Sequence, residues 1–203
     1  RKLVSNKGTF GKAAIAAGSP GMGGAAVMAA SAALRAGAGL TKAFVPRDIM
    51  YMFASRPELM AVADEDIQSL VQWATAFGIG CGSGGDASLR DPAGFAENTA
   101  KAFGCIVLLK GAVSVAAHPD GRLRYNASGN PGLAKGGSGD VLTGIITALL
   151  AQGLEPFDAA SAGAYILGSS AESALELLHE RALTAGDVLD AIEKTAGITE
   201  HRN

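Results

Sequence analysis

The chain has 203 residues, of which 48% are hydrophobic, and its formal net charge is −2. A chain of this length and apolar content can bury a sizeable core, so we expect one domain over residues 1–203. The near-neutral charge and the absence of a basic stripe argue against nucleic acid as a partner. No secretion-signal pattern opens the chain and no apolar run approaches ~18 residues, so we expect no membrane partner and a cytoplasmic location.

Apolar runs and glycine-rich turns divide the first half into alternating elements. Strands are predicted at 12–17, 40–45, 59–63 and 74–79, and helices at about 24–36, 48–55 and 64–73. The segment 48–55 holds Met50, Tyr51, Met52 and Phe53, which we expect in the core or at a subunit interface. We also expect a homo-oligomer, with a tetramer as one candidate.

The glycine loop between Gly18 and Gly24 supports two interpretations. Its spacing, Gly-x-x-Gly-x-Gly-Gly, departs from the dinucleotide-binding pattern Gly-x-Gly-x-x-Gly, so the signal for a nicotinamide oxidoreductase is weak. The glycines either let a ligand approach the backbone or let the helix and strand pack closely.

In the second half, a glycine loop at 80–85 follows a predicted strand and lies where α/β sheets bind ligands. A helix at 92–103, a buried strand at 105–109 and a hairpin around His118–Gly121 are expected next. Helices at about 156–178 and 184–195 close the chain. Cys81 and Cys105 lack metal spacing and are predicted to be buried, reduced thiols. Lys110, at a strand end, has two interpretations: it contacts a phosphate group of a ligand, or it is only exposed to solvent.

The stretch from Asn126 to Gly153 organises the chain. Four glycines and a proline between Gly129 and Gly137 favour a tightly turning loop, and the apolar residues after Asp140 favour a helix. The backbone amides of Gly137, Ser138 and Gly139 would then be unpaired at the positive end of the helix dipole. Unpaired amides and the dipole both favour the binding of an anion at this position.

Asp140 itself has two interpretations, a first-turn helix cap or a catalytic acid–base group. The Gly-Gly-Ser-Gly run before it favours catalysis, because a cap does not require backbone stripped of side chains where an anion would approach.

The run Asn130–Gly144 resembles the signature of the ADP- or ATP-dependent NAD(P)H-hydrate dehydratases, members of the ribokinase-like superfamily. Segments 7–12 and 18–26 and the triplet Leu109-Lys110-Gly111 share the resemblance. It implies a three-layer α/β/α fold with a mainly parallel central sheet. It also implies that Asp140 is catalytic, that Ala25, Gly82 and Asp140 contact the substrate, and that nucleotide is bound by Lys110, Gly111, Ala112, Val113, Ser114 and Gly139.

The chain departs from the family between Gly85 and Pro92. The family has further strand and helix material there, whereas Ser83–Asp91 passes almost at once into the next helix. A strand–helix–strand unit takes about 30 residues or more, so at least one such unit near 86–91 is missing, either omitted from the chain or deleted in a trimmed homologue. The residue at Cys81 also departs from the proline more usual in the family.

The resemblance implies repair of NADHX and NADPHX, the hydrated nicotinamide cofactors. ADP or ATP would phosphorylate the C6 hydroxyl, phosphate loss would restore the ring, and Mg²⁺ would share the charge of the phosphates. One alternative is a ribokinase-like kinase of a small hydroxylated metabolite. Another is a catalytically silent nucleotide-binding protein, should the middle unit be truly absent.

Overall fold

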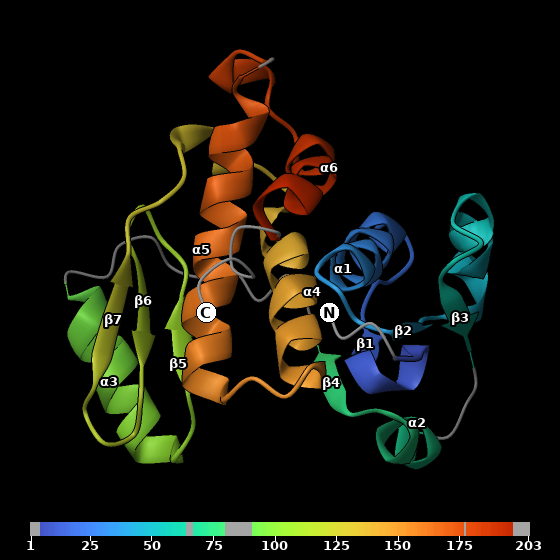
Figure 1. Cartoon of the computed structure of the whole chain (residues 1–203), viewed down its shortest axis with the longest axis horizontal. Helices are drawn as coiled ribbons and strands as arrows, with labels where there is room; N and C mark the ends of the chain where they lie inside the picture. Colours follow the sequence, from blue (N-terminus) through green and yellow to red (C-terminus); the bar gives the residue numbers. More distant parts are fainter. Residues whose placement is uncertain (1–4, 64–66, 80–90, 177, 197–203) are drawn as a thin grey trace.

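The computed structural model describes residues 5–63, 67–79, 91–176 and 178–196, and it has three layers (Figure 1). Helices α1, α4, α5 and α6 form one layer, β-sheet forms the middle, and α2 and α3 lie on the other face. The predicted three-layer α/β fold with a parallel central sheet is confirmed. The sheet layer is in two parts, which the sequence did not predict in that form.

The parallel part has four strands in the order β3-β2-β1-β4. Strand β1 (Lys12–Ala16) is central, with Lys12 opposite Leu40 of β2 (Leu40–Phe44) and Ala13 opposite Ala76 of β4 (Ala76–Ile79). Strand β3 (Met60–Val62) pairs with β2 at the outer edge. Helices α1 (Gly23–Arg35) and α2 (Ile67–Trp73) make the crossovers, as parallel pairing requires.

The second part is an antiparallel sheet in the order β5-β6-β7, made of Val107–Leu109, Ser114–Ala117 and Leu123–Asn126. The hairpin predicted around His118–Gly121 is confirmed, and the His118 amide donates to the Arg122 carbonyl across the turn at 2.9 Å. Helix α3 (Pro92–Phe103) packs on β5 and β6. Asp91 caps it and Gly104 ends it in the left-handed conformation, so both predicted ends are confirmed.

Helices α4 (Ser138–Ala151) and α5 (Pro156–Ala174) lie side by side in the centre of the molecule (Figure 1). Helix α4 packs on β1 and β4, and α5 packs on the antiparallel sheet. Helix α6 (Ala185–Ala196) covers α1 and α5. The central helices carry much of the core, including Val141, Ile145 and Phe157.

Two predicted segments differ from expectation in detail. Residues 47–55 form a 3₁₀ helix (η2, Arg47–Ser55) that buries Phe53, whereas Tyr51 is exposed within this chain, so its place at a subunit interface stays a prediction. Cys105 is exposed and precedes β5, whose three residues are only half-buried. The reason is that β5 pairs on one side only within the described chain, so it is an edge strand. Cys81 lies outside the described residues.

Helix α6 begins with reciprocal capping hydrogen bonds between Thr184 and Asp187. The Thr184 amide donates to the Asp187 carboxylate at 2.8 Å, the Thr184 hydroxyl donates to it at 2.5 Å, and the Asp187 amide donates back to that hydroxyl at 3.3 Å. The side-chain hydrogen bond from Thr184, followed by the backbone one, lowers the pKa of Asp187 below its ordinary value of 3.8.

Asp187→Asn is therefore expected to destabilise the fold by about 0.3–1 kcal/mol at pH 7, because it removes a negative charge from a helix N-terminus. A lowered folded-state pKa stabilises the fold above the unfolded value and loses that contribution as pH falls through the folded value. The difference in melting temperature between parent and variant should be constant above about pH 5 and shrink below about pH 4. A pH-independent difference would contradict this origin.

Among the described residues, no helix is both long enough and apolar enough to cross a membrane.

Candidate active site

The predicted glycine loop and helix N-terminus are present at α4. Gly137 is the N-cap, in the left-handed conformation at φ 95°, and it provides no capping side chain. The amides of Ser138, Gly139 and Asp140 occupy the first turn, where no carbonyl precedes them within the helix. A side chain at Gly136 or Gly139 would meet open space, so the approach to these amides is clear. The local geometry is that of an anion site.

Asp140 lies in this first turn and is half-buried. Its carboxylate makes no hydrogen bond or ion pair with any residue in the described ranges, so it is not acting as a cap there. A carboxylate without a protein partner beside an anion site is free to accept a proton from a bound hydroxyl group.

Lys135 anchors the loop to the C-terminal part of the chain rather than pointing to a ligand. Its ammonium group donates to the carbonyls of Arg181 and Leu183, each at 2.7 Å. The Ser138 hydroxyl donates to the Lys135 carbonyl at 3.2 Å, and the Asn130 side chain accepts from the Gly132 amide at 3.0 Å. These bonds fix the loop on both sides of its glycines.

A cavity of about 580 Å³ lies against the same loop. Four of the five predicted nucleotide residues in the segment 110–114 line it, namely Lys110, Gly111, Ala112 and Ser114. Val113 is exposed and is not among the lining residues. The opposite walls come from Asn126 and the loop 128–134, from Leu142 of α4, and from Ala164, Leu167 and Gly168 of α5.

The hairpin register explains why distant segments meet at this cavity. Ser114 pairs with Asn126, so the loop that enters β6 and the loop that leaves β7 emerge at the same end of the sheet. The side-chain amide of Asn126 donates to the Ala164 carbonyl at 3.2 Å, and the Gly129 amide donates to the Glu172 carboxylate at 2.6 Å. The loop is thereby held against α5.

Gly168 of α5 makes that approach possible, because a Cβ at this position would lie 2.1 Å from the Ser128 hydroxyl oxygen. The sequence analysis missed Ser128, Gly168 and Glu172. The contacting residues are about 40 positions apart, and local spacing carries no signal for a contact at that separation.

Ala25 lies in the first turn of α1, which packs tightly on α4. A Cβ on Gly137 would contact the Met28 sulfur, one on Gly144 would contact the Ala29 carbonyl, and Gln152 donates to the Ala36 carbonyl. These contacts advance in the same direction along both helices. The N-termini of α1 and α4 therefore lie toward the same end of the fold, Ala25 on one and Asp140 on the other.

The close-packing interpretation of the Gly18–Gly24 loop is confirmed at two of its glycines, and the ligand interpretation stays a prediction. A Cβ on Gly18 or Gly23 would clash with Ile49 or Met52 of η2, so these two allow close packing. Gly21 and Gly24 face open space and leave room for a ligand. Gly82, the remaining predicted substrate residue, lies outside the described residues.

The sequence profile described as NAD(P)H-hydrate dehydratase matches residues 13–93 and 85–194. The chain belongs to this family. A relative from Neisseria meningitidis named ADP-dependent (S)-NAD(P)H-hydrate dehydratase is 33% identical over 252 aligned positions, covering 92% of this chain and 85% of the relative. A relative from Moorella thermoacetica named bifunctional NAD(P)H-hydrate repair enzyme Nnr is 31% identical over 264 positions, covering 94% of this chain and 50% of the relative.

The chain thus spans about half the length of the bifunctional relatives that it matches. The alignments are also longer than the part of this chain that they cover. At 92% coverage of 203 residues, the chain fills only about 187 of the 252 positions aligned with the Neisseria relative. About 65 positions of this dehydratase relative therefore have no counterpart here.

Solved structures confirm the dehydratase fold. The Bacillus subtilis ADP/ATP-dependent NAD(P)H-hydrate dehydratase, co-crystallised with ATP and Mg²⁺, superposes with a TM-score of 0.85 at 24% identity, covering 98% of this chain and 94% of that one. A ribokinase-like superfamily protein from Enterococcus faecalis superposes with a TM-score of 0.81 at 23% identity, covering 98% and 90%. At these identities the likeness concerns the fold.

Proposed function

We propose that this chain dehydrates (6S)-NADHX and NADPHX to NADH and NADPH, with ADP or ATP as phosphoryl donor. The carrying observation is Asp140, a carboxylate in the first turn of α4 that has no partner among the described residues. Leu142 of the same helix lines the cavity formed by Lys110 to Ala112, by Ser114 and by the signature loop. Family membership and the relatives' names support the same activity.

In this proposal the carboxylate of Asp140 takes the proton from the C6 hydroxyl as its oxygen attacks the terminal phosphoryl group. The amides of Gly137, Ser138 and Gly139 stabilise the negative charge on the transferred group. The C6–O bond then breaks, inorganic phosphate leaves, and loss of a ring proton restores the dihydropyridine. Overall, NADHX and ATP give NADH, ADP and phosphate. With ADP as the phosphoryl donor, NADHX and ADP give NADH, AMP and phosphate.

The nucleotide would occupy the cavity beside the 110–114 loop. The Lys110 ammonium is exposed there and has no hydrogen bond or ion pair within the described part of the chain, so it can pair with a phosphate. Gly139 is proposed to bind the nucleotide as well, whereas Ala25, Gly82 and Asp140 are proposed to contact the hydrated nicotinamide substrate.

The residues present fit Mg²⁺ carried by a nucleotide. The described residues contain no group of three or more His, Cys, Asp or Glu side chains that could hold a metal ion. Magnesium in phosphoryl-transfer sites is commonly held by one or two carboxylates together with substrate phosphates. The nucleotide phosphates would supply most of its ligands, and the ion would neutralise charge on the phosphates. A cytoplasmic location and a homo-oligomeric state are further proposals.

The test is a coupled measurement of absorbance and phosphate. With nucleotide and Mg²⁺, the protein should regenerate the absorbance of the dihydronicotinamide at 340 nm from NADHX and release phosphate in equal amount. A phosphorylated product that accumulates without return of the chromophore would favour the small-metabolite kinase. Nucleotide binding without either product would favour the silent nucleotide-binding protein.

Gly111→Val is expected to weaken ADP and ATP binding by about tenfold or more, which corresponds to about 1.4 kcal/mol. Gly111 lines the cavity, and its new Cβ would lie 3.2 Å from the Val113 carbonyl oxygen, so a branched side chain there would both crowd the loop and occupy the cavity wall. Binding of NADHX should remain nearly unchanged. Isothermal titration with each ligand checks this, and equal loss of both affinities would indicate a misfolded strand end instead.

A further inference from the structure

The signature loop before α4 lies against a segment that comes much later in the chain. This segment, residues 180–185, begins with a short 3₁₀ helix that packs on the helical turn of the loop. A Cβ on Gly132 would lie 2.8 Å from Leu183 Cδ2, and one on Gly137 would lie 2.7 Å from the Ala185 Cβ. Both ends of the loop therefore contact the same segment, which we call the anchor segment.

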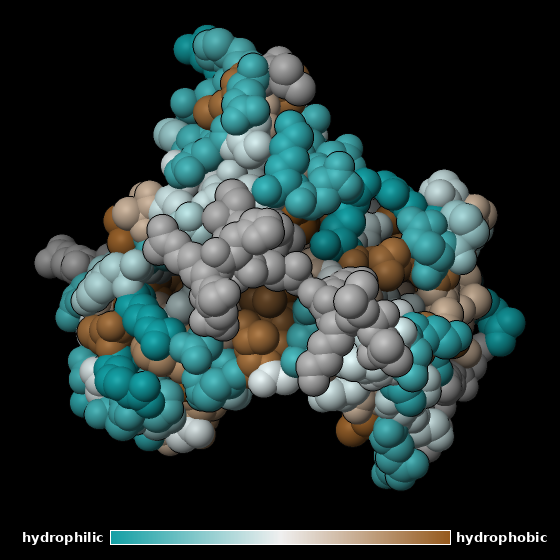
Figure 2. All heavy atoms as spheres, in the orientation of Figure 1, coloured by the Kyte–Doolittle hydropathy of each residue, from teal (hydrophilic) through white to brown (hydrophobic). Residues whose placement is uncertain are grey.

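The anchor segment is held in place by the core. Leu183 is fully buried and belongs to the main core cluster, together with Val188 and Ile192 of α6. The visible outer surface over α6 is mostly hydrophilic, so the apolar side chains of this part of the chain point inward (Figure 2). A segment fixed in this way can serve as a rigid support for the glycine-rich loop beside it.

Lys135 links the loop to the anchor segment. Its ammonium group donates to the carbonyls of Arg181 and Leu183, each at 2.7 Å, where the 3₁₀ helix ends. Carbonyls at the end of a helical turn lack partners within it and favour a nearby cation. At the other end of the same residue, the Ser138 hydroxyl donates to the Lys135 carbonyl at 3.2 Å. Lys135 is thus held by both its side chain and its backbone.

The residues between Lys135 and Asp140 depend most on this attachment. Gly136, Gly137 and Gly139 surround Ser138 there, and glycine has more conformational freedom than any other residue. In the proposed reaction the amides of this stretch stabilise charge on the transferred group, which requires donors that are already in place. A displacement of about 1 Å in a positioned group can lower a rate by about a hundredfold.

We propose that Lys135 is a positioning residue of the active site. Its hydrogen bonds to the anchor segment hold the amides of residues 137–139 in the arrangement that stabilises the transferred phosphoryl group. In this role the ammonium group acts through the loop and does not contact the nucleotide. The proposal rests on the proposed function, because it concerns the same reaction, and it makes the segment 180–185 a working part of the site.

The test removes the ammonium group and then supplies it from solution. Lys135→Ala is expected to lower kcat by about tenfold to a hundredfold, while the KM values for ATP and NADHX change by less than about threefold. Propylammonium replaces the missing part of the side chain, so it should restore kcat in a saturable manner. Tetramethylammonium carries the same charge but has no N–H group to donate, so it should not. Lys135→Arg keeps donors for both carbonyls and should retain more activity than Lys135→Ala.

A second measurement does not depend on turnover. Hydrogen exchange of the backbone amides of residues 136–140 should be about tenfold faster in Lys135→Ala than in the parent protein, and propylammonium should slow it again. Exchange within α6 should be unchanged, because the core holds that helix. A parent protein that does not dehydrate NADHX would contradict the proposed function. Unchanged loop exchange and unchanged kcat in an active protein would contradict only the role of Lys135.

Lys101→Ala is the matched control for the loss of an exposed lysine. Lys101 pairs with Glu97 on α3 at 2.6 Å, one helical turn away. Surface pairs of this kind contribute little to stability, and Lys101 lies outside the loop, so kcat and the exchange of residues 136–140 should match the parent values.

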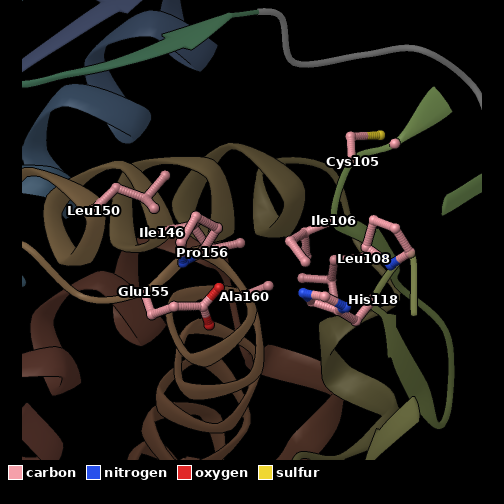
Figure 3. Close-up of a pocket in the computed structure, with 11 residues that line it drawn as sticks. Cys105, Ile106, Leu108, His118, Ile146, Leu150, Glu155, Pro156 and Ala160 are labelled. Carbon is pink, nitrogen blue, oxygen red and sulfur yellow. The ribbon is translucent and has the colours of Figure 1, made fainter. Parts of the chain in front are cut away.

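A further control addresses binding of the alkylammonium ion elsewhere. Figure 3 shows a second cavity, in which Ile146 and Leu150 of α4 lie near the Glu155 carboxylate. An apolar wall beside a carboxylate would attract a cation with an alkyl chain. The parent protein contains the same cavity, so its kcat is measured with propylammonium and should not change.

Three results would overturn the proposal. The first is a kcat of Lys135→Ala within about threefold of the parent value. The second is a rise in KM for the nucleotide with unchanged kcat, which would mean that Lys135 binds the nucleotide directly. The third is equal recovery of Lys135→Ala with both ions, or no recovery with propylammonium together with a Lys135→Arg protein as slow as Lys135→Ala.

Discussion

Replacing Asp140 with asparagine is expected to lower turnover at least about a hundredfold while leaving the melting temperature close to that of the parent protein. The two interpretations of this residue make opposite demands. If Asp140 were a helix cap, asparagine could replace it with little change in stability, and even complete removal of a cap costs only ~1 kcal/mol of folding free energy. A general base must accept a proton, which an amide cannot do. General base catalysis typically contributes about 10²- to 10⁴-fold to the rate.

The structure favours the second interpretation. Asp140 accepts no capping hydrogen bond from any described residue, and the N-cap position belongs to Gly137, which has no side chain. The variant loses no hydrogen bond or ion pair within the described ranges, and loses only the interaction of the charge with the helix N-terminus, worth about 0.3–1 kcal/mol. Affinity for nucleotide should be unchanged or slightly higher, because a negative charge near the phosphates is removed.

Asp158→Asn is the matched control. Asp158 is also an acid in the first turn of a helix, α5, but it is exposed and pairs with Arg124 at 2.5 Å. An exposed pair of this kind contributes about 0–1 kcal/mol, so this variant should keep its turnover. Melting temperature, nucleotide affinity and turnover are measured on the same preparations. An Asp140→Asn protein that is folded, binds nucleotide and retains more than about a tenth of the parent rate would reduce Asp140 to a structural role.

Elements governed by local rules could be predicted from the sequence. Helix α3 begins and ends where Asp91-Pro92 and Gly104 place it, since capping and glycine termination act within one turn. The hairpin follows from its Pro-Asp-Gly turn, and the start of α4 follows from its glycine run to within two residues. The candidate site could be predicted for the same reason, because Asp140 and its amides lie in one continuous stretch.

Features that depend on packing between distant parts of the chain could not be predicted from the sequence. The sequence around Lys135 suggests a cation available for an anion in the loop. Its ammonium group instead donates hydrogen bonds to two carbonyls nearly 50 residues away in the sequence. Cys105 follows an apolar pattern, but burial needs a neighbour on each side, and β5 has one described neighbour. The cavity walls from α5 are set by Gly168, whose significance appears only when Ser128 lies against it.

Gly144→Ala is expected to destabilise the protein by at least about 2 kcal/mol, although alanine in a helix interior is ordinarily favoured over glycine by about 1 kcal/mol. Gly144 lies where α4 crosses α1. A Cβ there would sit 2.1 Å from the Ala29 carbonyl oxygen and 2.8 Å from the Ala32 Cβ. The obstacle is backbone within a helix, which cannot rotate away as a flexible side chain would, so the two helices must separate.

That separation would reach the site, because α1 and α4 carry Ala25 and Asp140 at their N-termini. Turnover of Gly144→Ala should therefore fall together with its stability, and a loss of 2 kcal/mol corresponds to about 4–8 °C in melting temperature for a domain of this size. Gly24→Ala is the control, since Gly24 is also helical and a Cβ there meets nothing within 4 Å. Its melting temperature should be unchanged or slightly raised. A melting temperature of Gly144→Ala equal to or above that of the parent protein would contradict the prediction. It would mean that the close packing of α1 on α4 does not restrict the size of the side chain at this position.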